Sequence, residues 1–147
     1  WVSTLPYLHS VKSPEGEDTV PNYYSVKEIP AAEFQQTFLA AYPEASFAGG
    51  PETWITGRVE NASGRVESIC IGGVTVEGTQ VRSLLGLRSA CFTAEAAADR
   101  VTFRVTGFGH GVGMSQYGAN RLAQEGKSWQ EILHWYYTGV TIAPYGG

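Results

Sequence analysis

The chain has 147 residues, of which 43% are hydrophobic and 16% charged, a balance typical of one folded domain and not of a disordered segment. Its net charge of −4 comes from 10 basic and 14 acidic side chains, and the scatter of the basic ones disfavours nucleic acid as a partner. Apolar runs such as 38–42 fall far short of the ~18–20 residues that cross a bilayer, so no membrane span is expected within the chain.

The amino-terminal part begins Trp1-Val2-Ser3-Thr4, without the basic and apolar regions of a leader, so we expect any targeting signal to have been removed or to lie upstream of a cut. Proline, glycine and acids over 13–18 predict an exposed loop, and a short strand is expected at 24–29. Phe34 and Phe38 then recur at helical spacing, which predicts a helix over 31–42 that docks on a sheet.

The middle of the chain alternates with period two, which predicts antiparallel strands. Turn residues at 61–64 join two of them as a hairpin, and Gly72-Gly73 separates the next pair, so a β-meander is expected. Apolar residues three and four apart predict a short helix over 78–85. The expected strands cover 53–59, 65–71, 74–76 and 100–105.

The last third places glycine at every second position over 107–113, a pattern that predicts a tight loop. Two helices are expected after it, at 117–125 and 129–137, the second opened by a capping box of Ser128 and Glu131. Residues 140–142 are expected to return as a strand. The predicted fold is α+β, a twisted antiparallel sheet with three to four helices.

Four aromatic residues surround the last predicted helix. Trp129 and Tyr136 fit its core stripe, whereas Trp135 and Tyr137 are expected to stay partly exposed. Such exposed rings suit stacking on sugars or contact with another protein segment.

The glycine-rich loop continues Gly113-Met114-Ser115-Gln116, which leaves one imidazole, one hydroxyl and one amide on an otherwise bare backbone. A ligand can approach the main-chain N–H groups of such a loop closely. The spacing differs from that of a phosphate-binding loop, a dinucleotide fingerprint and a hydrolase nucleophile elbow, which disfavours nucleotide enzymes and α/β-hydrolases.

The segment 107–119, with the later groups Glu131-Ile132-Leu133 and Tyr136-Tyr137-x-Gly139, resembles the carboxy-terminal signature of the stage II sporulation protein D family. Upstream, Pro6-Tyr7-Leu8 and the segment 82–92 are similar to the family's middle and sheet regions. The resemblance therefore covers nearly all of residues 1–147, which we expect to be the carboxy-terminal half of the family domain and one lobe of a larger domain.

The resemblance implies an extracytoplasmic lytic transglycosylase that cleaves the MurNAc–GlcNAc linkage of peptide-stripped peptidoglycan strands during sporulation, in the engulfment step. One carboxylic acid protonates the leaving oxygen and then, as base, helps the sugar's own 6-hydroxyl close an anhydro ring. No cofactor or metal is implied. The family places that acid, a glutamate, in an upstream segment that this chain lacks, so the isolated chain is expected to be inactive.

Partners and location follow from the same resemblance. The expected partners are peptidoglycan glycan strands, the upstream segment of the same domain and a membrane-bound amidase complex. The expected location is the cell-wall side of the membrane, with the full-length protein anchored upstream. Two alternatives stay open: a non-catalytic wall-binding or amidase-enhancer module, and a structural domain whose glycine loop is only a turn.

The candidate substrate-binding residues fall in two places. In the signature, His110 is suited to hydrogen bonding with a saccharide or with the missing glutamate, or to holding the loop's shape. Gln116 and Tyr117 offer groups for sugar hydroxyls, as does Ser115, which is equally suited to capping the next helix.

Outside the signature, Arg82 and Arg88 present guanidinium groups that suit an acetamido carbonyl or a lactyl carboxylate, and a structural ion pair is the alternative. The chain's own carboxylates include none in a plainly apolar context, so no catalytic acid is assigned among them. Cys70 and Cys91 are left open between a disulfide and free thiols.

Overall fold

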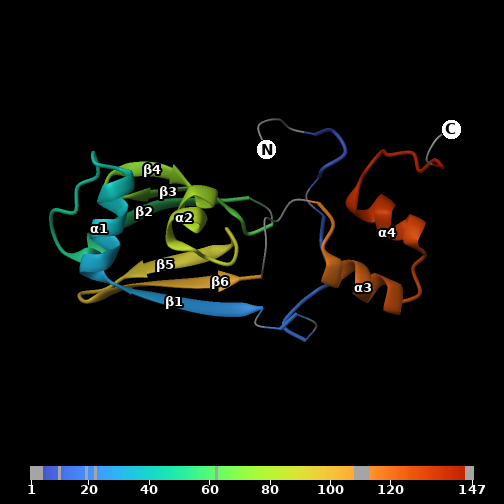
Figure 1. The fold of residues 1–147 in the computed structure, drawn as a ribbon, viewed down its shortest axis with the longest axis horizontal. Helices are drawn as coiled ribbons and strands as arrows, with labels where there is room; N and C mark the ends of the chain where they lie inside the picture. The colour runs from blue at the N-terminus through green and yellow to red at the C-terminus, as the bar shows by residue number, and fades with distance from the viewer. Residues whose placement is uncertain are drawn as a thin grey trace. The chain divides into compact units, whose positions relative to one another are not determined.

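The computed structural model of the chain describes residues 5–9, 11–18, 20–21, 23–61, 63–107 and 113–144 (Figure 1). The chain divides into two compact units. The first, here called the sheet unit, covers Asn22–His110, and the second, the helical unit, combines Trp1–Pro21 with Gly111–Gly147. The α+β class is thereby confirmed, with strands and helices partly segregated along the chain.

The sheet unit contains two antiparallel sheets of three strands each, in the orders β1-β6-β5 and β2-β3-β4. A 3-10 turn, Pro51–Thr53, precedes β2. The strands are β1 (Tyr24–Pro30), β2 (Ile55–Glu60), β3 (Val66–Ile71), β4 (Val74–Glu77), β5 (Phe92–Ala96) and β6 (Arg100–Thr106), and the helices are α1 (Ala31–Ala41) and α2 (Gly78–Leu85).

The predicted meander is confirmed in β2-β3-β4. Gly72 and Gly73 both have positive φ, as a two-residue hairpin turn with matching twist requires, and Ile71 pairs with Val74 across it. The prediction of one sheet is corrected to two, because the chain leaves the meander at Glu77, whose side chain caps α2 together with Gln80. The strand at β5, which was not predicted, pairs with β6 instead.

The core of the sheet unit draws side chains from both sheets and both helices. Phe34 and Phe38 of α1 are fully buried, as their spacing predicted. The ring of Phe34 stacks on Trp54 and contacts Phe103 of β6, with centroids 6.5 and 6.0 Å away. Burial of each such aromatic side chain contributes roughly 1.5–3 kcal/mol, so α1 is held mainly by its apolar face.

The helical unit is built on α3 (Gln116–Gln124) and α4 (Trp129–Tyr136), whose buried hydrophobic residues are Leu122, Ile132 and Tyr136. The capping box of Ser128 and Glu131 is confirmed. The burial predicted for Trp129 is wrong, since its side chain is 58% exposed. α4 begins at this residue, and the small core lies further along the helix.

The strand expected at 140–142 is also wrong, because residues 140–144 have no regular structure. α4 ends when the Tyr137 N–H bonds back to the Leu133 carbonyl, and the Thr138 N–H donates to the carbonyl of Tyr7. Among the described residues, 140–142 therefore find no strand to pair with. No helix among the described residues combines the length and apolarity that a membrane span needs.

Candidate functional site

The glycine-rich loop enters the described part of the structure at Gly113. Residues 108–112, and with them His110, lie outside the described residues, so the role of His110 stays a prediction. Gly113 has a φ of 84°, a left-handed conformation that favours glycine. The loop therefore reaches α3 through a backbone turn that most other residues would strain.

Two tyrosines hold the exit of this loop. The Met114 N–H donates to the hydroxyl of Tyr137, at 3.3 Å, and the ring of Tyr137 packs edge-on against Tyr7, with centroids 6.3 Å apart. The Thr138 N–H donates to the Tyr7 carbonyl at 3.1 Å. Tyr137 is half-buried and Tyr7 exposed, as is Met114, so the loop exit presents rings at the surface.

The first turn of α3 carries three of the predicted substrate-binding residues. Ser115 is the N-cap, and its hydroxyl accepts from the Gly118 N–H at 3.1 Å, so the capping role that the sequence left open is present. Gln116 and Tyr117 are exposed on the same turn, Tyr117 by 47%. Their groups are available to a ligand, while contact with substrate stays a prediction.

Gly118 fixes this turn by a close approach that the sequence analysis missed. A Cβ at this position would collide with three oxygen atoms, the Tyr136 hydroxyl, the Ser13 hydroxyl and a Glu15 carboxylate oxygen. Ser13 links the other two by hydrogen bonds. Burial raises the pKa of Tyr136, so its hydroxyl stays protonated. The start of α3 is thus held by a polar cluster instead of a broad apolar face.

Arg82 and Arg88 belong to the sheet unit. The Arg82 Nε donates to the Arg88 carbonyl at 3.4 Å, across the left-handed Gly86 that ends α2, and both arginines are half-buried. The structure therefore places these two residues beside each other, and places Ser115, Gln116 and Tyr117 together in the helical unit.

Two acidic residues have pKa values below their ordinary range: Glu131, chiefly because the Ser128 backbone N–H bonds to its carboxylate, and Asp99, chiefly through its hydrogen bond from Arg100. Both stay ionised at neutral pH, the opposite of what a general acid needs. Cys70 and Cys91 are free thiols, and burial raises the pKa of Cys91. The described residues contain no group of three or more metal-ligating side chains.

Comparison with known proteins extends the resemblance seen in the signature. Over 143 residues, 97% of the chain, it is 45% identical to Stage II sporulation protein D of Bacillus subtilis (strain 168). It is 40% identical over the same length to the protein of that name in Bacillus amyloliquefaciens. The chain is homologous to stage II sporulation protein D. It spans 40% of the length of each of these relatives.

A third relative of this chain has a different name. The Amidase enhancer of Bacillus subtilis (strain 168) is 33% identical over 90 residues, which cover 59% of this chain and 13% of the relative. No protein-family model matches the chain. The similarity to stage II sporulation protein D thus extends over more of the chain and is the stronger of the two.

Proposed function

We propose that this chain acts in cell-wall remodelling during sporulation, as the substrate-groove lobe of a lytic transglycosylase that cleaves peptide-stripped glycan strands during engulfment. The observation that supports this most strongly is the 45% identity to Stage II sporulation protein D along 97% of the chain. The transglycosylase chemistry itself rests on the resemblance of the glycine-rich signature. The homologues' names support a role in sporulation, and the proposal adds the reaction to that role.

The proposed groove uses the loop exit and the first turn of α3. Gln116 and Tyr117 would hydrogen-bond to sugar hydroxyls, and the exposed ring of Tyr7 would lie against a sugar face. In the sheet unit, and apart from this groove, Arg82 and Arg88 would bind an acetamido carbonyl or lactyl carboxylate through paired N–H donors. His110 would hydrogen-bond to the saccharide or to the catalytic glutamate.

The reaction needs one carboxylic acid, which we place in a segment upstream of residue 1. As acid it protonates the glycosidic oxygen, and as base it takes the proton from the sugar's 6-hydroxyl while that oxygen attacks the anomeric carbon. The products are a free sugar end and a 1,6-anhydro end, so no water is consumed. No cofactor takes part in this scheme.

The same proposal includes the protein's binding partners and its location in the cell. The full-length protein would be anchored to the membrane upstream of this chain and would act on the cell-wall side, beside a membrane-bound amidase that removes stem peptides first. Glycan strands and the upstream segment would be the direct partners of this chain.

A chimera tests the role in sporulation. The matching 143-residue region of the Bacillus subtilis stage II sporulation protein D is replaced by this chain, and heat-resistant spores are counted in a strain that lacks the native protein. Restored spore formation is the expected result, and the same protein with the region deleted is the control. Failure by a stable, correctly located chimera would contradict the proposed role.

Digestion of peptide-free glycan strands tests the chemistry. The chimera should produce anhydro-sugar ends, and His110→Ala and Gln116→Ala should lower the rate. If the two variants leave both glycan affinity and rate unchanged, the glycine-rich loop is a structural turn and the groove is elsewhere.

The match to the Amidase enhancer favours a second candidate, a non-catalytic wall-binding or amidase-enhancing module. In that case the chimera would bind glycan strands and stimulate a partner amidase but release no anhydro ends. The two candidates are separated by the product analysis alone.

A further inference from the structure

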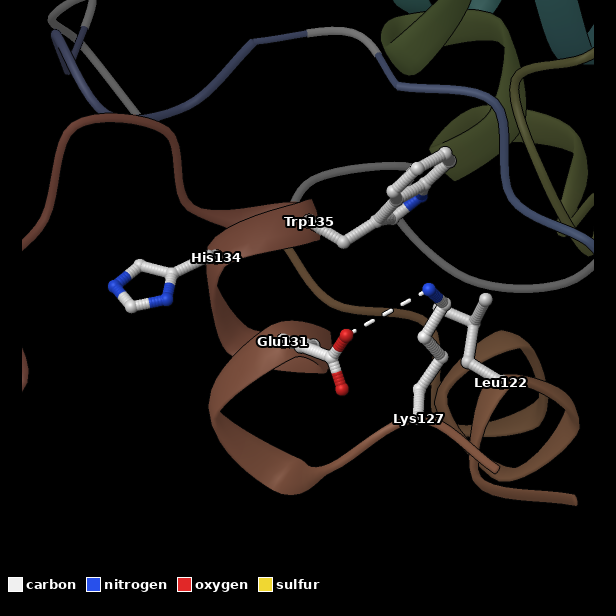
Figure 2. Close-up of a pocket in the computed structure, with 5 residues that line it drawn as sticks. All are labelled: Leu122, Lys127, Glu131, His134 and Trp135. Carbon is white, nitrogen blue, oxygen red and sulfur yellow. Dashed lines mark ion pairs between the residues drawn. The ribbon is translucent and has the colours of Figure 1, made fainter. Parts of the chain in front are cut away.

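A pocket of about 350 Å³ lies in the helical unit, on the side of α4 that carries Trp135 (Figure 2). One of its lining residues, Trp135, is an exposed ring that the sequence already suggested for stacking on sugars, and the others were not candidates for substrate binding. The lining residues are Leu122, Lys127, Glu131, His134 and Trp135. Ligand pockets typically measure about 300–1,000 Å³, so this one suits a small group such as a single sugar ring.

Trp135 supplies a flat apolar wall. Its side chain is 46% exposed, yet its indole N–H donates to the Lys12 carbonyl at 3.1 Å, which restrains the ring. A large ring already held in one orientation loses little conformational entropy when a ligand packs on it. Leu122, buried in the small core, adds a second apolar surface.

The polar side of the pocket is an ion pair. Figure 2 shows Lys127 and Glu131 pointing toward each other, and their Nζ and Oε1 atoms are 3.6 Å apart. The other carboxylate oxygen of Glu131 accepts from the Ser128 N–H and hydroxyl, each at 2.8 Å. The pair offers an acceptor and several donors with no net charge, and the exposed imidazole of His134 lies on the next turn.

This combination suits a sugar ring, which has an apolar face for Trp135 and hydroxyls for the Lys127 ammonium and the Glu131 carboxylate. We propose that the pocket is a saccharide subsite that seats one pyranose ring of a glycan strand. The identity of the glycan rests on the proposed function, while the site itself rests on the pocket.

Calorimetric titration of the full chain with tri-N-acetylchitotriose, and separately with peptide-free glycan strands, tests the subsite. Trp135→Ala should weaken binding by about tenfold or more, the loss expected when a central aromatic anchor is removed. Trp135→Phe loses the indole N–H but keeps a ring, and should stay within about threefold of the wild type.

Trp129 gives a matched control, because it is an exposed tryptophan on the same helix that does not line the pocket. Trp129→Ala should leave the dissociation constant unchanged, and circular dichroism should show equal helix content in all variants. The proposal is overturned if Trp135→Ala binds like the wild type, if both alanine variants weaken binding equally, or if the wild-type chain binds neither saccharide.

The spore count of the chimera separates this failure from that of the proposed function. If the chimera restores spores while its Trp135→Ala variant binds glycan normally, the subsite proposal fails and the proposed function stands. If the chimera forms no spores but binds saccharide in a way that depends on Trp135, the proposed function fails and the subsite proposal stands.

Discussion

The two units of the chain are stabilised in different ways. The sheet unit has a continuous apolar core with fully buried side chains such as Phe34, Phe38 and Phe103. In the helical unit the buried apolar cluster of the described residues is limited to Leu122, Ile132 and Tyr136, supplemented by caps and by the polar contacts around Gly118. The glycine-rich signature therefore leads into the unit with less apolar burial, and functional segments are often drawn from the less stable parts of a protein.

The largest expected effect is in the core of the sheet unit. Phe34→Ala removes a fully buried ring and should lower the free energy of unfolding by about 3–5 kcal/mol. Urea denaturation followed by circular dichroism measures it. Tyr24→Ala, at a side chain that is 59% exposed, removes only the edge-on contact with Tyr23 and should lower stability by about 0.5–1.5 kcal/mol. Equal effects of the two substitutions would contradict the contrast between core and surface.

Gly118→Ala tests the close approach in the helical unit. At an ordinary helix position this change stabilises by about 0.5–1 kcal/mol, but here the added Cβ collides with three oxygen atoms, so a loss of about 1–3 kcal/mol is expected. Hydrogen exchange of α3 and α4 amides measures it. Ala123→Gly, at an exposed position of α3, should also destabilise, by about 1 kcal/mol. An increase in stability on Gly118→Ala would contradict this, because it would show that the three oxygen atoms move aside at little cost.

A smaller effect is expected at the start of α4. Ser128→Ala removes the side-chain acceptor for the Glu131 N–H and should destabilise the helical unit by about 1 kcal/mol. Calorimetric melting temperatures measure the change. Ser83→Ala, at an exposed position inside α2, removes no cap and should have little effect. If the two serines behave alike, the cap contributes nothing to the helical unit.

The smallest effect concerns pH. The folded-state pKa of Glu131 is lowered below its ordinary 4.5, chiefly by the Ser128 backbone N–H, so the stabilisation is fully present above that value. It is lost as the pH falls through the lower folded-state pKa, because the protonated carboxyl accepts these bonds poorly. Between pH 6 and 3, a range of about three units around the ordinary pKa of a glutamate, the melting temperature should therefore fall less steeply for Glu131→Gln than for the wild type. Parallel curves would contradict this assignment.

Local signals in the sequence were sufficient for much of the fold. The spacing of Phe34 and Phe38 located α1, and Ser128 with Glu131 located α4, because each signal involves residues within one or two helical turns. The Gly72-Gly73 turn was equally local. Such interactions depend on sequence distance and can be recognised without knowing the fold.

The errors arose where the structure of a segment depends on residues far away in the sequence. β5 alternates Phe92 with two alanines, a weak pattern, and its place depends on pairing with β6. The division into two sheets depends on the same pairing. Residues 140–142 have a strand-like composition, but a strand forms only beside a partner, and within the described part of the chain they pair with none.

The candidate site was predictable in part. The resemblance named the segments that contain Tyr7 and Tyr137, but no spacing rule shows that residues from opposite ends of the chain meet at the loop exit. The contact of Ser13 and Glu15 with Gly118 was missed for the same reason. The available signal was Gly118 itself, because a glycine weakens a helix and its presence inside one suggests that another group packs closely against it.

The hydrogen bond from the Gly107 N–H to the Tyr23 carbonyl, 2.6 Å long, bears on the order of folding. It joins the two ends of the sheet unit, which is inserted between the two sequence segments of the helical unit. Ser13 and Tyr136 are 123 positions apart, so bringing them together from an unfolded chain closes a long loop at a high entropic cost. Once the sheet unit has formed, its two ends are joined and the loop that is left to close is shorter. We therefore expect the sheet unit to fold first and the helical unit to assemble after it.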